Sequence, residues 1–101
     1  YLQRSFTGAA SPVDMEEARV CGRKAVEFAM AGDLDGSVAI QRAKGTKYKA
    51  TFERAKLRDV ARETKDLPAS YLNRSGNHVS KRFIDYAAPL VGDLPTVAKL
   101  F

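Results

Sequence analysis

Apolar residues recur at intervals of three and four between Pro12 and Ala31, which predicts a helix over this range. Ser11 is the expected N-cap, Pro12 stands at the first helical position, and Gly32 is the expected left-handed stop. Gly22 in the interior costs about 1 kcal/mol relative to alanine, and a close approach to a neighbouring strand would explain its use. The apolar stripe consists of Met15, Ala18, Cys21, Ala25, Phe28 and Ala29.

Two short segments have the residue pattern expected of β-strands. Ser37–Arg42 is partly β-branched and follows a turn rich in glycine and aspartate, so we expect a strand packed on the first helix. In the next run, Tyr48, Ala50 and Phe52 face one way, and the residues between them face the other. We expect both strands to belong to a larger parallel sheet.

The second half of the chain has a weaker pattern. Apolar residues at 57–61 indicate a short amphipathic turn or helix that ends before Pro68. A last helix is predicted from Asn77, as its N-cap, to about Ala88, before Pro89. Its apolar stripe consists of Val79, Phe83, Tyr86, Ala87 and Leu90. The order helix, strand, strand, helix indicates the α/β or α+β class.

Composition narrows the class of protein. The chain has 101 residues and a net charge of +5. A hydrophobic fraction of 45% beside a charged fraction of 29% argues against a disordered chain, and seven Gly with four Pro exclude a collagen-like one. No apolar stretch approaches the ~20 residues that cross a bilayer, so no membrane partner is expected. The single cysteine excludes an intrachain disulfide and fits a cytoplasmic protein. Because the chain begins at Tyr1 without an initiator Met, we expect a C-terminal piece of a longer polypeptide.

Few residues are candidates for chemistry. The lone histidine, His78, has no second histidine, no nearby serine in a recognisable nucleophile elbow and no partner carboxylate at metal spacing, so we interpret it as a surface or capping residue. Cys21 lies on the apolar stripe and is expected in the core. Asp33 and Asp35 lie in a glycine-bounded turn, where local hydrogen bonds explain them better than a metal does. We therefore expect neither a catalytic group nor a metal site in this segment.

A basic run offers one alternative function. Arg42, Lys44, Lys47 and Lys49 are interleaved with aromatic residues, and Arg54, Lys56 and Arg58 extend the positive region. Such a strand face could follow a phosphate backbone in a small RNA-binding or protein-interaction module. A solvated face is the preferred interpretation, because the aromatic residues alternate onto the opposite side. No nucleic-acid partner is expected.

The first eleven residues form a candidate anion-binding loop. Tyr1 and Arg4 lie at the end of a presumed strand, and small residues follow them up to Ser11. A guanidinium group suits a phosphate monoester because it donates two parallel hydrogen bonds. The helix that follows presents its N-terminus, which also favours anions.

These residues also carry a family resemblance. The chain resembles the C-terminal portion of phosphofructokinases, over Tyr1–Arg4, Ala10–Asp14, Gly22–Val26, Ala29–Gly32, Leu57–Ala61, Gly76–Val79 and Phe83–Leu90. The ATP-dependent bacterial enzymes read His-Ile-Gln-Arg-Gly-Gly-Ser-Pro in the first segment. The tyrosine at position 1 and the longer loop before Ser11 make the chain more similar to the pyrophosphate-dependent branch.

The resemblance implies both a fold and a function. The implied fold is an α/β fragment of a Rossmann-like domain, with two main helices and short strands. The implied enzyme transfers a phosphoryl group from pyrophosphate to the 1-hydroxyl of fructose 6-phosphate in glycolysis. Residues 1–101 would form part of its sugar-phosphate site, with residues 1–11 as the substrate-binding strand end and loop. Arg4 would hold the 6-phosphate, and Tyr1 would add a hydrogen bond to the sugar.

Other parts of the enzyme are implied to lie outside the chain. The catalytic aspartate, Mg²⁺ and the phosphate-holding loops would precede Tyr1 in the same polypeptide, so the isolated fragment is expected to be inactive. A homo-oligomer is expected. An ATP-dependent 6-phosphofructokinase remains the alternative for the donor, since the residues that select the donor lie upstream.

Overall fold

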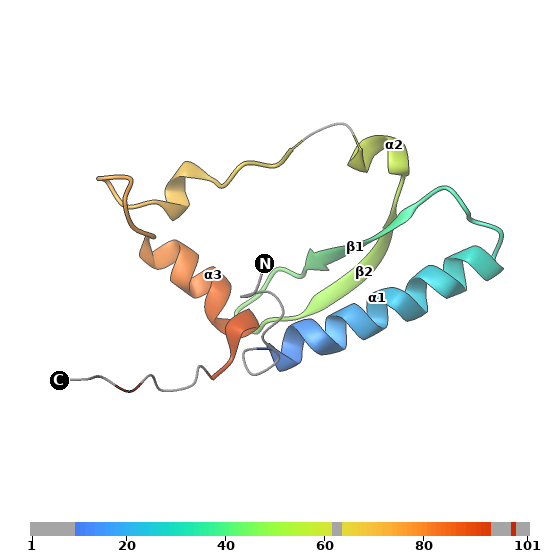
Figure 1. The fold of residues 1–101 in the computed structure, drawn as a ribbon, viewed down its shortest axis with the longest axis horizontal. Coiled ribbons are helices and arrows are strands. Elements are labelled where there is room, and N and C mark those ends of the chain that lie inside the picture. The colour runs from blue at the N-terminus through green and yellow to red at the C-terminus, as the bar shows by residue number, and fades with distance from the viewer. Residues whose placement is uncertain (1–9, 62–63, 94–97, 99–101) are drawn as a thin grey trace. The chain divides into compact units, whose positions relative to one another are not determined.

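The structure is a computed structural model that describes residues 10–61, 64–93 and 98. Its elements are α1 (Pro12–Met30), β1 (Ser37–Arg42), β2 (Ala50–Ala55), α2 (Leu57–Val60), the 3₁₀ helix η3 (Ala69–Tyr71) and α3 (Lys81–Val91), as Figure 1 shows. Helices and a two-stranded sheet confirm the predicted α/β fragment. The chain divides into two compact units. Unit 1 contains the residues up to Met15 and those from Pro68 onward, and unit 2 is Glu16–Leu67.

Local signals at both ends fix α1. The hydroxyl of Ser11 accepts a hydrogen bond from the Asp14 N–H at 3.2 Å, as an N-cap does. At the other end, Gly32 has φ 83° and its N–H bonds the carbonyl of Ala29. The Asp33 N–H bonds the carbonyl of Phe28 at 2.9 Å, which completes a Schellman motif. The predicted helix is confirmed to within one residue.

The prediction for Gly22 is wrong. A Cβ atom built at this position meets nothing within 4 Å, so no strand approaches the helix there among the described residues. Glycine is therefore not required by packing at this point of the described structure.

The strands β1 and β2 form an antiparallel hairpin, in register from Ser37 opposite Ala55 to Arg42 opposite Ala50. The expected parallel pairing is wrong for these two strands, because a connection of seven residues permits only the antiparallel arrangement. The alternation in β2 is confirmed: Ala50 and Phe52 are half-buried, whereas Thr51 and Glu53 are exposed. The short helix α2 lies where the 57–61 pattern predicts it.

The start and end of α3 differ from the prediction. The side-chain oxygen of Asn73 accepts the N–H groups of Asn77 and His78, at 3.1 and 3.2 Å, which holds Asn77 in a loop. Ser80 takes the N-cap position instead. The helix also continues through Pro89 to Val91, because a proline in the final turn removes only one backbone hydrogen bond.

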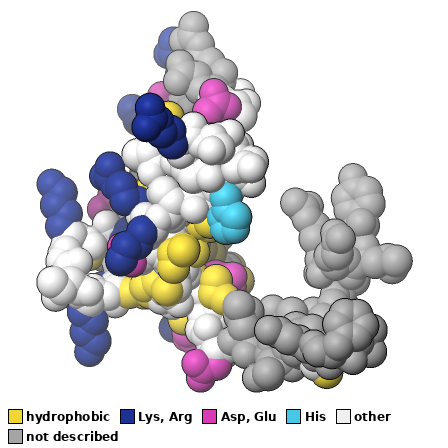
Figure 2. Space-filling view, turned by 90° about the vertical axis from the view of Figure 1, so that its left-hand side faces the viewer, with side chains coloured by type: hydrophobic (Ala, Val, Ile, Leu, Met, Phe, Trp, Pro, Cys, Tyr) yellow, Lys and Arg dark blue, Asp and Glu magenta, His cyan; other side chains and the backbone are white. Residues whose placement is uncertain are grey.

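No described residue is buried, which corrects the expected core. Cys21 is half-buried rather than enclosed. Unit 1 nevertheless has direct ring packing: Tyr71 lies 5.7 Å from Phe83 and 5.5 Å from Tyr86 between ring centroids. Figure 2 shows hydrophobic side chains, in yellow, at the surface. None of the described helices is long and apolar enough to cross a membrane.

Candidate functional site

The two predicted substrate residues, Tyr1 and Arg4, lie outside the described residues. Their roles therefore stay predictions. The described structure begins at Ala10, where the predicted loop of residues 1–11 joins α1.

Within unit 1, Ser11 connects the end of this loop to the first turn of α1 and to the last turn of α3. Besides accepting the Asp14 N–H, its hydroxyl donates a hydrogen bond to the backbone carbonyl of Leu90 in the last turn of α3. One hydroxyl thus satisfies a backbone donor that the start of α1 leaves unpaired and a carbonyl that the end of α3 leaves unpaired. The point where the predicted loop ends is thereby fixed to α3.

The N-terminus of α1 offers few donors for an anion. Pro12 has no N–H, and the N–H of Asp14 is already bonded to Ser11. The Asp14 carboxylate also lies in the first turn, where it complements the helix dipole. The expected contribution of this helix end to phosphate binding is correspondingly reduced.

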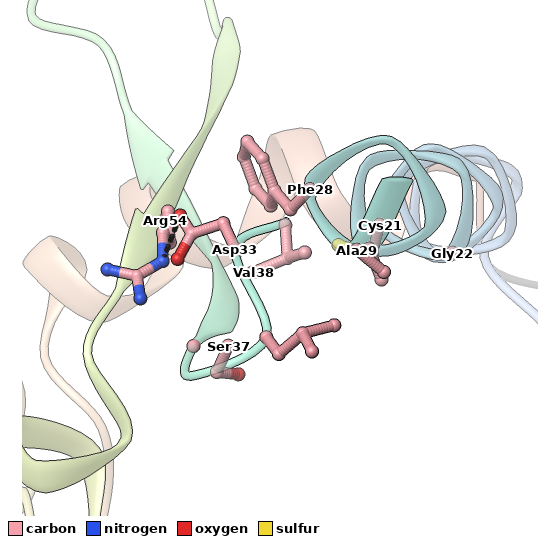
Figure 3. A pocket seen from close by; sticks show the side chains of 11 residues that line it. Cys21, Gly22, Phe28, Ala29, Asp33, Ser37, Val38 and Arg54 are labelled. Atoms are coloured by element: carbon pink, nitrogen blue, oxygen red, sulfur yellow. Dashed lines mark ion pairs between the residues drawn. The ribbon is translucent and has the colours of Figure 1, made fainter. Parts of the chain in front are cut away.

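Unit 2 contains a hollow that the sequence did not reveal. A cavity of about 480 Å³ lies between the second half of α1, the turn after it and the hairpin (Figure 3). Its lining is mostly apolar and consists of Cys21, Gly22, Ala25, Phe28, Ala29, Asp33, Leu34, Gly36, Ser37, Val38 and Arg54. The strand predicted to pack on the helix is thus separated from it by this cavity. Four residues of the apolar stripe of α1, Cys21, Ala25, Phe28 and Ala29, form one wall.

An arginine on the hairpin joins the two sides of the hollow. The Arg54 guanidinium forms an ion pair with the Asp33 carboxylate, drawn as a dashed line in Figure 3, and donates to the backbone carbonyl of Asp35. The Arg54 side chain is only 25% exposed. Gly36 leaves room for it, because a Cβ atom there would lie 2.7 Å from the Arg54 Nε.

This contact corrects the interpretation of Arg54 as part of a positive surface. Its charge is compensated by Asp33, whose carboxylate is thereby occupied in a structural ion pair. A signal was present in the sequence, since Arg54 falls on the same side of the β2 alternation as Ala50 and Phe52. An arginine at an inward position needs a partner.

The hollow is suited to binding an apolar group. The ion pair at its edge carries no net charge, and the wall on α1 consists of small and aromatic side chains. No group of three or more potential metal ligands occurs within residues 10–61, 64–93 and 98.

The basic run forms the turn of the hairpin. Lys44, Lys47 and Lys49 are exposed, as predicted for a solvated face. The guanidinium of Arg42 lies 5.1 Å from the centre of the Tyr48 ring, and the Tyr48 hydroxyl donates to the Glu17 carboxylate of α1. The tyrosine is thus held by other parts of unit 2 rather than presented beside the lysines.

His78 lies at the surface, as predicted, and is the cyan side chain in Figure 2. Its Nδ1 accepts the Val79 N–H at 2.9 Å, and its carbonyl accepts the Asn73 N–H at 2.8 Å. These bonds stabilise the loop before α3.

Comparison with known proteins gives a consistent result, although no family model matches the chain. Over 91% of its length the chain is 44% identical to a pyrophosphate–fructose 6-phosphate 1-phosphotransferase of Rhodospirillum rubrum, of which it covers 22%. Over 99% of its length it is 36% identical to the protein of that name from Halomonas elongata, of which it covers 26%.

The chain is also similar in fold to a solved structure of a protein with a related name. The pyrophosphate-dependent phosphofructokinase of Marinobacter aquaeolei superimposes on 97% of the chain with a TM-score of 0.84 and 32% identity, and the chain covers 26% of it. The chain thus spans about a quarter of the length of the proteins it matches.

Proposed function

We propose that this chain, which is related in sequence and fold to about a quarter of a pyrophosphate-dependent phosphofructokinase, is the part of such an enzyme that binds fructose 6-phosphate. The enzyme would transfer a phosphoryl group from pyrophosphate to the 1-hydroxyl of the sugar. The observation that carries the proposal is the 44% identity over 91% of the chain to a protein named for this reaction.

The residues with a direct role in this proposal are Arg4 and Tyr1. Arg4 holds the 6-phosphate through two parallel charge-assisted hydrogen bonds, and Tyr1 adds a further hydrogen bond to the substrate. Because the 6-phosphate does not react, holding it serves to place the 1-hydroxyl in line with the donor.

The remaining parts of the reaction belong to the rest of the polypeptide. Mg²⁺ would neutralise phosphate charge there. The described residues contain no cluster of three metal ligands, so no step is assigned to a metal within them. The isolated chain is inactive in this proposal, because it lacks the donor site and the base.

Further features of the proposal follow from the whole enzyme. It acts in glycolysis, in the cytoplasm, and as a homo-oligomer. Pyrophosphate is favoured over ATP as donor because the relatives and the solved neighbour are named for pyrophosphate. Among the described residues, no contact favours the alternative RNA-binding or protein-interaction module, since the Tyr48 hydroxyl is bonded to Glu17.

The test is the substitution of Arg4 in the full-length enzyme. Arg4→Ala leaves the phosphate underpaired, so kcat/KM for fructose 6-phosphate should fall by about 30- to 1000-fold, or ~2–4 kcal/mol. Arg4→Lys should restore only part of the lost kcat/KM, because an ammonium group cannot donate the two parallel hydrogen bonds of a planar guanidinium group. Steady-state kinetics with each substrate varied in turn give the answer.

The control is the KM for pyrophosphate, which should change much less because the donor binds elsewhere. The assignment of Arg4 fails if the kinetics for fructose 6-phosphate stay within a few-fold of the parent enzyme. It also fails if the KM for pyrophosphate changes by a larger factor than kcat/KM for fructose 6-phosphate.

A further inference from the structure

The hydroxyl of Ser11 makes two hydrogen bonds that serve different purposes. As an N-cap it accepts the Asp14 N–H at 3.2 Å, a bond that any capping side chain with an acceptor oxygen provides. As a donor it bonds the backbone carbonyl of Leu90, which is 79 positions further along the chain. Capping of α1 needs only the first bond, so the second bond requires a separate explanation.

The second bond attaches the start of α1 to the end of α3. Because α3 ends at Val91, the Leu90 carbonyl has no N–H partner within the helix. The helix itself is packed on η3 through a cluster of three aromatic rings. Both partners of the bond belong to unit 1. Ser11 is thereby fixed to the part of the described chain in which aromatic rings pack directly on one another.

The two predicted substrate residues precede this bond closely in the sequence. Arg4 is seven positions before Ser11, and Tyr1 is ten positions before it. A chain that is fixed at one end samples a smaller volume than a free chain, and the restriction is greatest where few residues intervene. A bond at Ser11 therefore limits the positions open to the segment that precedes it.

From these contacts we propose that Ser11 is a positioning residue of the sugar-phosphate site. Its bond to Leu90 holds the end of the segment that carries Arg4, so that the guanidinium group meets the 6-phosphate in a larger fraction of molecules. The inference rests on the proposed function, because it requires Arg4 to bind this phosphate. It adds a residue that acts through the chain joining it to Arg4 and not through its own contact with the sugar.

Substitution of Ser11 in the full-length enzyme tests the proposal. When only a fraction of molecules is competent to bind, the apparent dissociation constant rises by the inverse of that fraction, whereas the bound complex reacts as before. Ser11→Ala should therefore raise the KM for fructose 6-phosphate about 5- to 20-fold, with kcat and the KM for pyrophosphate changed less than about twofold. Ser11→Thr retains a hydroxyl group and should recover most of the loss.

Ser80 provides a matched control for a general loss of stability. Its hydroxyl donates to the Ser70 carbonyl at 2.7 Å, and it also stands at the N-cap of a helix in unit 1. Ser80→Ala removes a comparable hydrogen bond far in sequence from Arg4, so the KM for fructose 6-phosphate should change less than about twofold. An equal rise of this KM in Ser80→Ala and Ser11→Ala would overturn the proposal.

A double-mutant cycle with Arg4 separates positioning from other effects of Ser11. In the Arg4→Ala background there is no guanidinium group left to position, so adding Ser11→Ala should change the KM for fructose 6-phosphate less than about twofold. The same rise in both backgrounds would overturn the proposal, because Ser11 would then act without Arg4.

Failure of this inference is distinct from failure of the proposed function. An unchanged KM in Ser11→Ala, together with the expected loss of kcat/KM in Arg4→Ala, would overturn only the positioning role. Unchanged sugar kinetics in Arg4→Ala alone would instead overturn the assignment of Arg4, and the positioning role with it.

The parent enzyme gives a further test that does not require Ser11→Ala to fold. Linkage is reciprocal: if the bond to Leu90 favours binding of the sugar phosphate, the bound sugar phosphate favours this bond. Saturating fructose 6-phosphate should therefore slow hydrogen exchange of the amides in the last turn of α3 at least about twofold, whereas pyrophosphate alone should not. Exchange that the sugar phosphate leaves unchanged would overturn the proposal.

Discussion

Different interactions stabilise the interior of each of the two units of this chain. In unit 1, η3 and α3 meet through the rings of Tyr71, Phe83 and Tyr86. In unit 2, α1 and the hairpin stand on either side of a cavity of about 480 Å³, and the Arg54–Asp33 ion pair links the turn after α1 to the hairpin. Unit 1 thus shows packing made by its own residues. In unit 2, the described residues of α1 and the hairpin leave a cavity between them.

The largest effect of a single substitution on stability is expected in unit 1. Phe83→Ala removes a ring that contacts two others, and because the ring is half-buried the cost should be about 1–3 kcal/mol. Hydrogen exchange of α3 amides in the full-length enzyme should accelerate accordingly. Ile84→Ala is the control, since Ile84 is 53% exposed and should change exchange little. Equal effects would show that the rings do not stabilise α3.

Loss of the Ser11 hydroxyl should have the next largest effect. Ser11→Ala leaves the Asp14 N–H and the Leu90 carbonyl without their partner, at a cost of about 0.5–2 kcal/mol. Ser11→Thr keeps the hydroxyl and should recover most of the loss. Hydrogen exchange in the first turn of α1 and the last turn of α3 measures both ends at once. A change confined to α1 would show that the bond to Leu90 contributes nothing.

Breaking the ion pair in unit 2 should cost less, about 0.5–1.5 kcal/mol, because both partners are partly exposed. Arg54→Met keeps much of the apolar stem and removes the charge that faces Asp33. Hydrogen exchange of β1 and β2 amides in the full-length enzyme is the measurement. Arg58→Met on exposed α2 is the matched control. If the two variants behave alike, the ion pair does not hold the hairpin.

The lysines of the hairpin turn should matter least. Lys44, Lys47 and Lys49 are exposed, so replacing all three with Gln should change stability by less than about 0.5 kcal/mol per site. Kinetics with fructose 6-phosphate should stay nearly unchanged. A large loss of activity in a folded triple variant would contradict the solvated face. A salt-dependent affinity of the parent enzyme for single-stranded RNA, absent in the variant, would instead support a nucleic-acid surface.

The elements that the sequence predicted well depend on local chemistry. The start of α1 follows from Ser11 and Pro12, its end from Gly32, and the faces of β2 from strict alternation. The start of α3 was missed because the Asn73 side chain competes for the N–H groups of Asn77 and His78. Such a contact depends on the conformation of the loop and leaves no periodic signal.

Of the two candidate sites, one could be predicted from the sequence and the other could not. The resemblance to pyrophosphate-dependent phosphofructokinases is carried by short motifs, and comparison with known proteins confirms this resemblance. The sugar-phosphate site at Tyr1 and Arg4 stays a prediction. The hollow could not be predicted, because it depends on where the hairpin lies relative to α1. The apolar stripe alone is compatible with either a filled core or an open cavity.

Gly36 places a constraint on how this part of the protein can change in evolution. A Cβ atom at this position would lie 2.7 Å from the Arg54 Nε and 3.2 Å from the carbonyl oxygen of Ala55. A larger residue at 36 is therefore acceptable only with a smaller or displaced side chain at 54, and that change would take from Asp33 the guanidinium that now neutralises it. Positions 33, 36 and 54 are thus expected to vary together among relatives, although the first and the last are 21 positions apart in the sequence.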